Sequence, residues 1–147
     1  MLIQPYLIFN GRCEEALTFY KNAVDAEELM LMRYKDSPEP LPPGMVPPES
    51  EDKIMHVSFR IGESIVMASD GDCAEQPGAS GQPEFLGVSL SLSVATEAEA
   101  KRYFAALAEG GQVQMPLEKT FWSPCFGTLC DRFGVSWMVN VEDPNQA

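Results

Sequence analysis

An internal repeat constrains this chain more than any other feature of its sequence. Residues 15–20 and 99–104 both begin with Glu-Ala and both end with an aromatic pair, at an offset of 84. The two residues in between differ. Residues 60–64 and 132–136 share an Arg, an apolar residue, a Gly and a Ser, at an offset of 72. A stretch at 37–50 with six prolines lengthens the first copy and explains the smaller second offset. Two matches in the same order indicate a duplicated folding unit.

Both copies also predict the same order of elements. Thr96 and Glu99 form a capping box before one apolar helical face, and Asn10 with Gly11 offers a cap before the other. The helices are expected at 12–24 and 97–109, and the strands at 2–9, 28–35, 54–61, 64–70, 88–94, 112–118, 124–131 and 135–142. The predicted fold class is α+β, with one βαβββ module at 1–70, a connector at 71–84 and a second module at 85–147, in one compact domain.

Composition excludes several classes of partner. The net charge of −12 argues against nucleic acid, because phosphate contacts need clustered Lys and Arg, and it disfavours anionic membranes. No apolar run is long enough to span a membrane, and the N-terminus lacks the basic region of a signal peptide, so we expect a cytoplasmic protein. The four cysteines match no metal-binding spacing and are expected as reduced thiols, with Cys13 in the core.

Three stretches carry a resemblance to a known family. They are residues 5–20 (Pro-Tyr-Leu-Ile-Phe-Asn-Gly followed by Glu-Glu-Ala-Leu-Thr-Phe-Tyr), His56-Val57 with Met-Ala-Ser-Asp at 67–70, and the aromatic and glycine-rich stretch 121–137. Together they resemble the PhnB-like branch of the vicinal oxygen chelate superfamily, which includes glyoxalase I, bleomycin-resistance proteins and extradiol dioxygenases. The resemblance covers essentially the whole chain and implies the glyoxalase/bleomycin-resistance/dihydroxybiphenyl-dioxygenase fold.

Members of this branch often carry the label 3-demethylubiquinone-9 3-methyltransferase. The residues give that label no support, because no glycine-rich turn from a strand into a helix opens a βαβ unit.

Metal-dependent members of the superfamily hold their metal on the first and last strands of each unit. The resemblance places these positions at Pro5 and Ser89, and at Val66 (Met67 if the register slips by one) and Met138. None is a His, Asp or Glu, and the chain has a single histidine. Catalytic transition metals need imidazole and carboxylate ligands, so we expect no metal site and no cofactor.

The resemblance also implies a cavity enclosed by the curled sheets, and strand alternation gives its lining. His56 would share one face of its strand with Ser58 and Arg60. Serines and a methionine of the second module would line another wall of the cavity. The candidate ligand-binding residues are Ser58, Arg60, Ser89, Ser91, Met138 and Trp122. The alternative is an ordinary solvated sheet face, with Trp122 in the core and Arg60 in an ion pair.

Two residues are candidates for acid–base chemistry. His56 is the only side chain with an ordinary pKa near neutrality, although a lone strand histidine also serves structure. Asp70 would orient His56, accept a proton, or simply end its strand.

Three functions remain open from sequence. The first is a metal-free protein that holds a small organic molecule, with no assigned reaction. The second is a superfamily enzyme, such as an isomerase, lyase or dioxygenase. The third is an antibiotic-sequestering protein, for which a charge of −12 suits a cationic drug. We expect a homodimer, because superfamily members of this size commonly pair units across a two-fold axis and open sheet edges need cover.

Overall fold

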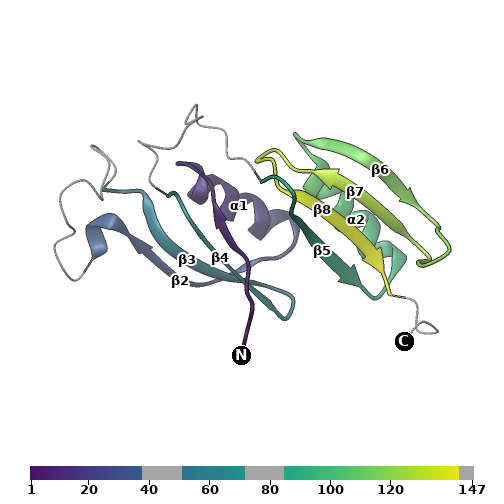
Figure 1. Ribbon diagram of the computed structural model, residues 1–147, viewed down its shortest axis with the longest axis horizontal. Helices are drawn as coiled ribbons and strands as arrows, with labels where there is room; N and C mark the ends of the chain where they lie inside the picture. Colours follow the sequence, from purple (N-terminus) through teal and green to yellow (C-terminus); the bar gives the residue numbers. More distant parts are fainter. Residues whose placement is uncertain (38–50, 72–84, 143–147) are drawn as a thin grey trace. The chain divides into compact units, whose positions relative to one another are not determined.

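A computed structural model describes residues 1–37, 51–71 and 85–142 of the chain. Its contacts divide the chain into two compact units, Met1–Pro83 and Glu84–Ala147. The first contains β1 (Tyr6–Ile8), α1 (Cys13–Ala23), β2 (Glu27–Arg33), the 3₁₀ turn η1 (Tyr34–Asp36), β3 (Ile54–Ile61) and β4 (Ser64–Ser69) (Figure 1). The second contains β5 (Ser89–Val94), α2 (Glu97–Ala108), β6 (Gln112–Glu118), β7 (Phe126–Cys130) and β8 (Ser136–Val141).

The two predicted loops fall largely outside the described residues. Only Ser37 represents the proline-rich stretch at 37–50, and only Gly71 represents the predicted connector at 71–84. Cys73 also lies outside the described ranges.

Each unit has one four-stranded mixed sheet. The strand orders are β1-β4-β3-β2 and β5-β8-β7-β6. In both, the first strand runs parallel to the last strand of the unit and the other pairs are antiparallel. This confirms the predicted α+β class with two βαβββ modules. The first strand is shorter than the predicted 2–9, because only Tyr6–Ile8 pair with β4.

The repeated residues occupy equivalent places in the two units. Ala16 of α1 and Ala100 of α2 are both fully buried, so each helix places a small core side chain at the matching position. Tyr20 stacks on Phe59 of β3 with ring centroids 6.1 Å apart. Gly62 and Gly134 both take positive φ in the turn before the last strand, a conformation in which glycine avoids a steric cost.

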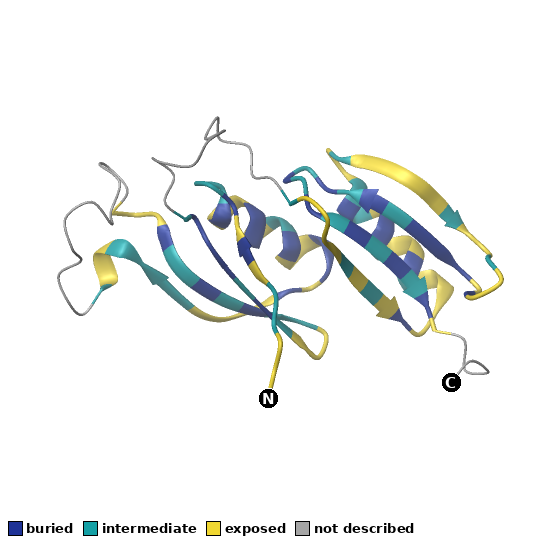
Figure 2. Cartoon of the chain, in the orientation of Figure 1, coloured by how far each residue is buried: buried dark blue, intermediate teal, exposed yellow. Residues whose placement is uncertain are grey.

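One face of each sheet is buried and the opposite face is open. Along β3, Val57 and Phe59 are buried while His56 and Ser58 are partly exposed. Along β8 the same alternation separates buried Trp137, Val139 and Val141 from Ser136, Met138 and Asn140. Figure 2 shows this alternation along β7 and β8. The predicted division of β3 into an apolar helix-packed face and a polar face is what the structure has.

A buried carboxylate closes the turn before β8. Asp131 accepts hydrogen bonds from the backbone N–H of Phe133 (2.8 Å) and Val135 (3.1 Å), and from the Trp137 indole (2.9 Å). The turn before β8 therefore depends both on the hydrogen bonds that the Asp131 carboxylate accepts and on the positive φ of Gly134. In the described ranges, no helix has the length and apolar character needed to cross a membrane.

Candidate functional site

The open face of the first sheet brings His56 together with a residue that sequence reasoning did not select. Tyr6 lies across β4 from β3, and its hydroxyl is 3.3 Å from Nδ1 of His56. The two rings have centroids 5.6 Å apart and are tilted by 37°. Tyr6 is 45% exposed, so a ligand can reach the pair. Strand alternation could have pointed to Tyr6, because it faces the side of β1 opposite to buried Leu7.

The register also settles which positions of the first unit face the open side. Tyr6 is opposite Met67, and Met67 is opposite Ser58. Val66 is only 5% exposed and pairs with buried Phe59, so it belongs to the helix-packed face. The open-face positions nearest to the expected Pro5 and Val66 are therefore Tyr6 and Met67, one residue further along each strand. Neither is a carboxylate or an imidazole.

Methionines surround His56 on this face. Met32 is opposite His56, and Met30 is opposite Ser58, on the edge strand β2. Flexible thioether side chains adapt to ligands of different shapes. The open face thus combines a polar pair, Tyr6 and His56, with deformable apolar neighbours.

Arg60 lies at the far end of the same strand face and is already paired. Its guanidinium forms an ion pair of 2.8 Å with Glu27 of β2, with both side chains largely exposed. Of its two expected roles, the ion pair is the one present in the structure.

Asp70 lies on the opposite side of the sheet from His56. It is 2% exposed, and its carboxylate accepts from the backbone N–H of Cys13 (2.8 Å) and of Ile54 (2.6 Å). The predicted cap from Asn10 and Gly11 is wrong, because helix α1 begins after Arg12 without a side-chain cap from that loop. Asp70, distant in sequence, supplies the acceptor instead. Its position favours a structural role over orientation of His56.

Cys13, the first residue of α1, is a core residue. It is 1% exposed, and burial raises the pKa of its thiol, with further increases from the charges of Asp70 and Glu14. A raised pKa keeps the thiol protonated and unreactive, so the helix N-terminus does not activate it.

The open face of the second sheet carries the other predicted ligand-binding residues. Ser89 donates to Ser136 Oγ at 2.9 Å, and Ser91 is opposite Met138. Their strand neighbours Leu90 and Trp137 belong to the opposite face. The serine-rich alternation therefore places hydroxyl groups together on one sheet face.

Trp122 lies in the turn between β6 and β7, against Phe126. The two rings meet edge to face with centroids 5.3 Å apart. Phe126 is 8% exposed and Trp122 is 41% exposed, so Trp122 covers a buried neighbour and still presents ring surface. Phe126 is opposite Asn140, whose buried Oδ1 has no hydrogen-bond partner among the described residues.

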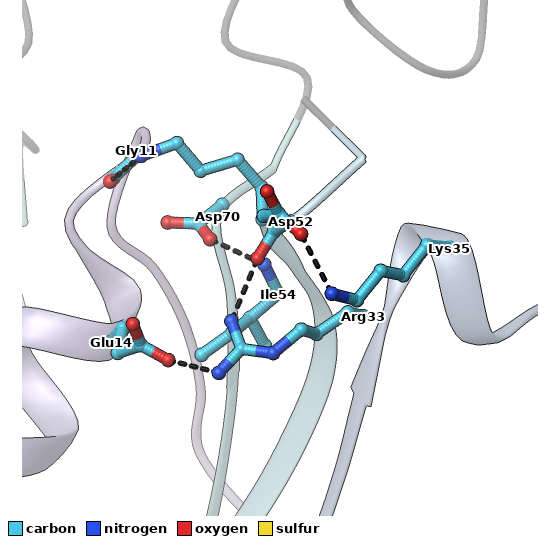
Figure 3. A pocket seen from close by; sticks show the side chains of 8 residues that line it. Gly11, Glu14, Arg33, Lys35, Asp52, Ile54 and Asp70 are labelled. Atoms are coloured by element: carbon cyan, nitrogen blue, oxygen red, sulfur yellow. Dashed lines mark hydrogen bonds and ion pairs between the residues drawn. The ribbon is translucent and has the colours of Figure 1, made fainter. Parts of the chain in front are cut away.

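The first unit also has a charged pocket that the sequence did not indicate. It has a volume of about 410 Å³ and is lined by Gly11, Glu14, Arg33, Lys35, Asp52, Lys53, Ile54 and Asp70. Figure 3 shows Arg33 pointing between Glu14 and Asp52, with Lys35 directed at Asp52. These residues come from segments far apart in sequence, which explains why no motif revealed the pocket.

A metal site requires several donor groups close together. Within 1–37, 51–71 and 85–142, no three His, Cys, Asp or Glu side chains gather in an arrangement that could hold a metal ion.

Comparison with known proteins places the chain in a family. A model of the 3-demethylubiquinone-9 3-methyltransferase family matches residues 2–140. The chain belongs to this family. Protein YjdN from Escherichia coli (strain K12) is 36% identical, with 99% of this chain and all of the relative covered.

Solved structures agree with this 3-demethylubiquinone-9 3-methyltransferase family membership. Protein PA1353 from Pseudomonas aeruginosa is 44% identical, with a TM-score of 0.77 and 97% of this chain and 98% of that chain covered. The PhnB protein from Bacillus cereus is 30% identical, with a TM-score of 0.72 and coverages of 96% and 99%. The PhnB-like resemblance is confirmed.

A more distant likeness shows the fold alone. The fosfomycin resistance protein FosX from Mesorhizobium loti is 14% identical, with a TM-score of 0.62 and coverages of 99% and 94%. The expected glyoxalase-type, vicinal oxygen chelate fold is therefore confirmed.

Replacing Asp70 with Ala should destabilise the protein strongly. Two backbone N–H groups would lose a charged acceptor, so we expect the free energy of unfolding to fall by about 3–5 kcal/mol. Asp70→Asn keeps one acceptor oxygen and should lose less. Asp52→Ala removes an 83% exposed carboxylate and should leave the urea midpoint nearly unchanged. An Asp70→Ala variant as stable as the wild type would contradict the structural role.

Proposed function

We propose that this protein binds a small organic molecule against the open face of its first sheet, with His56 and Tyr6 as the principal polar contacts and without a metal ion. The observation that carries the proposal is the contact between the Tyr6 hydroxyl and His56 Nδ1. The Tyr6–His56 pair lies on the sheet face opposite the residues that pack on α1. A polar pair that is accessible and surrounded by methionines is suited to a mainly apolar ligand with one polar group.

The open face of each unit, taken by itself, offers further proposed ligand contacts. Ser58 adjoins His56 on its strand face. Ser89, Ser91 and Met138 lie on the open face of the second sheet, and Trp122 adds aromatic surface in that unit. Arg60 would have to exchange its partner Glu27 for a ligand, so we assign it a secondary role.

The hydrogen bond to Tyr6 allows His56 two modes of action. If the Tyr6 hydroxyl donates to Nδ1, His56 presents Nε2–H as a donor to the ligand. If Nδ1–H donates to Tyr6, the free Nε2 is a base. In either tautomer His56 can contact a ligand through Nε2. Only the tautomer with a free Nε2 would also support weak proton transfer.

We do not extend methyl transfer to this chain from the family description. The mixed β1-β4-β3-β2 and β5-β8-β7-β6 sheets differ from a parallel nucleotide-binding sheet. Binding without an assigned reaction is the function that the residues support best. A superfamily enzyme and an antibiotic-sequestering protein are the rivals, the latter favoured by the net charge of −12.

His56→Ala should weaken binding of the molecule that copurifies with the protein, identified by native mass spectrometry. Loss of one ligand hydrogen bond costs about 0.5–1.5 kcal/mol of binding free energy, or more where a charged partner is left unpaired. We expect the melting temperature to change little. Tyr6→Phe should lower affinity in the same direction, because it removes the hydroxyl that orients the imidazole.

Arg60→Gln serves as the control on the same strand face, and it should affect binding less than His56→Ala. A stable His56→Ala variant with unchanged binding would remove His56 from the site. If His56 is structural, the variant should instead lose about 1–3 kcal/mol of stability and its binding loss should follow unfolding. Titration of the same variants with bleomycin, a cationic glycopeptide, tests the sequestering alternative.

Protein purified without chelators should contain well under one equivalent of Fe, Ni, Zn or Mn. The open-face positions Tyr6, Met67, Ser89 and Met138 offer no imidazole or carboxylate. A FosX structure from Listeria monocytogenes is a complex with Mn(II), so metal content also separates this proposal from the enzyme alternative. Elemental analysis that finds a stoichiometric metal would refute the metal-free reading.

We also propose that the protein is a cytoplasmic homodimer. The edge strands β2 and β6 expose apolar side chains, including Met30 (44%), Val113 (49%) and Met115 (47%), and exposed edges favour pairing with another chain. Light scattering should give about twice the chain mass of 16.2 kDa. A monomeric mass at high protein concentration would contradict the dimer.

A further inference from the structure

The charged pocket of the first unit collects three cationic side chains from different elements. Arg33 ends β2, Lys35 lies in η1, and Lys53 directly precedes β3. The pocket has a volume of about 410 Å³, enough for a small ion with its first hydration water. None of the open-face residues proposed above lines it, so it is independent of the proposed ligand site.

The acidic side chains in the pocket already have partners. The Asp70 carboxylate accepts from the backbone N–H of Cys13 and Ile54. Glu14 is bound by Nη2 of Arg33, whose Nη1 donates to the Asp52 carbonyl at 2.7 Å. Arg33 and Glu14 therefore form a fixed wall, and their charges compensate each other.

Lys53 differs from its neighbours because its partner is uncharged. Its ammonium donates to the carbonyl oxygen of Gly11 at 2.9 Å, and no carboxylate lies within ion-pair distance among the described residues. An ammonium has three donors, so the bond to Gly11 orients the group and leaves further donors for a ligand. By contrast, Lys21 is neutralised by Glu28 in a pair of 3.1 Å.

Lys35 is a second cation that a ligand can recruit at low cost. Its bond of 2.8 Å to Asp52 joins two side chains that are 53% and 83% exposed. Exposed ion pairs contribute little to stability, so this pair can open without disturbing the fold. Hydrogen bonding and charge from Asp52 raise the pKa of Lys35, and a lysine is already protonated at neutral pH at its ordinary pKa.

We propose that this pocket binds a small oxyanion of the phosphate type, held between Lys53 and Lys35 beside the Arg33 guanidinium. The donor groups come from three elements and approach from different directions. A tetrahedral oxyanion, whose oxygens point in several directions, can accept from all of them, whereas a planar carboxylate ligand cannot do so as well. The bound ion replaces Asp52 as the partner of Lys35 and supplies Lys53 with the charged partner it lacks. Figure 3 shows Lys35 and Arg33 reaching toward Asp52 in this pocket.

Titration with inorganic phosphate tests the proposal by ¹⁵N–¹H NMR, with sodium chloride added to the reference at equal ionic strength. We expect saturable shifts at the backbone amides of Gly11, Lys53 and Ile54. Lys53→Gln should weaken phosphate binding about tenfold, since a charge-assisted hydrogen bond is lost. Lys35→Gln, at an exposed position without a role in the fold, should also weaken it.

Lys21→Gln is the matched control, because it removes one positive charge from the same unit outside the pocket. It should change phosphate affinity less than about twofold, since salt screens distant charges. Equal weakening by Lys21→Gln and Lys35→Gln, or shifts that never saturate, would overturn the proposal. The natural ligand could be free phosphate or a phosphate ester, and a parallel titration with methyl phosphate distinguishes them. Equal or tighter binding of methyl phosphate identifies a phosphate ester, and weaker binding identifies the free ion.

Discussion

The buried carboxylate of Asp70 holds the first unit together at the point where its elements meet. It joins the end of β4 to the first turn of α1 through Cys13, and to the start of β3 through Ile54. Its backbone carbonyl also accepts from Gly11 in the loop before the helix. A charged acceptor buried among backbone donors is strong, and removing it would leave those donors unsatisfied. The direction of α1 and the base of the charged pocket both depend on this residue.

Because α1 packs on one face of the sheet, the other face is left open. Leu7, Val57 and Phe59 turn toward the helix, and the residues between them turn away from it. That alternation brings Tyr6 and His56 into contact from two strands separated by β4. The buried core residues of the first unit and its proposed ligand contacts therefore lie on opposite faces of the sheet.

Duplication preserved the framework of the unit and let the open faces diverge. Ala16 and Ala100 are fully buried at matching helix positions in both units, and Gly62 and Gly134 keep the last turn. The first open face has an imidazole and methionines, whereas the second has a row of serines with Met138. The units thus share a fold through their buried residues and differ in the chemistry that they expose.

Local patterns in the sequence were sufficient for the order of the elements and for the two faces of β3. Helical spacing located α1 and α2 to within a residue at each end, and alternation placed His56 opposite the helix-packed side. The capping of α2 by Thr96 was also predictable, because its acceptor and donor are three residues apart. In each case the interaction involves neighbours along the chain.

By itself, the sequence determined the duplicated βαβββ architecture and the presence of a single histidine, His56. Only the tertiary structure decided that Asp70 caps α1, that Tyr6 contacts His56, and that Lys53 has a neutral partner. The physical reason is sequence separation. These contacts join residues 42 to 57 positions apart, and they depend on strand register and on how the chain closes. Neither is encoded in a local pattern of residues.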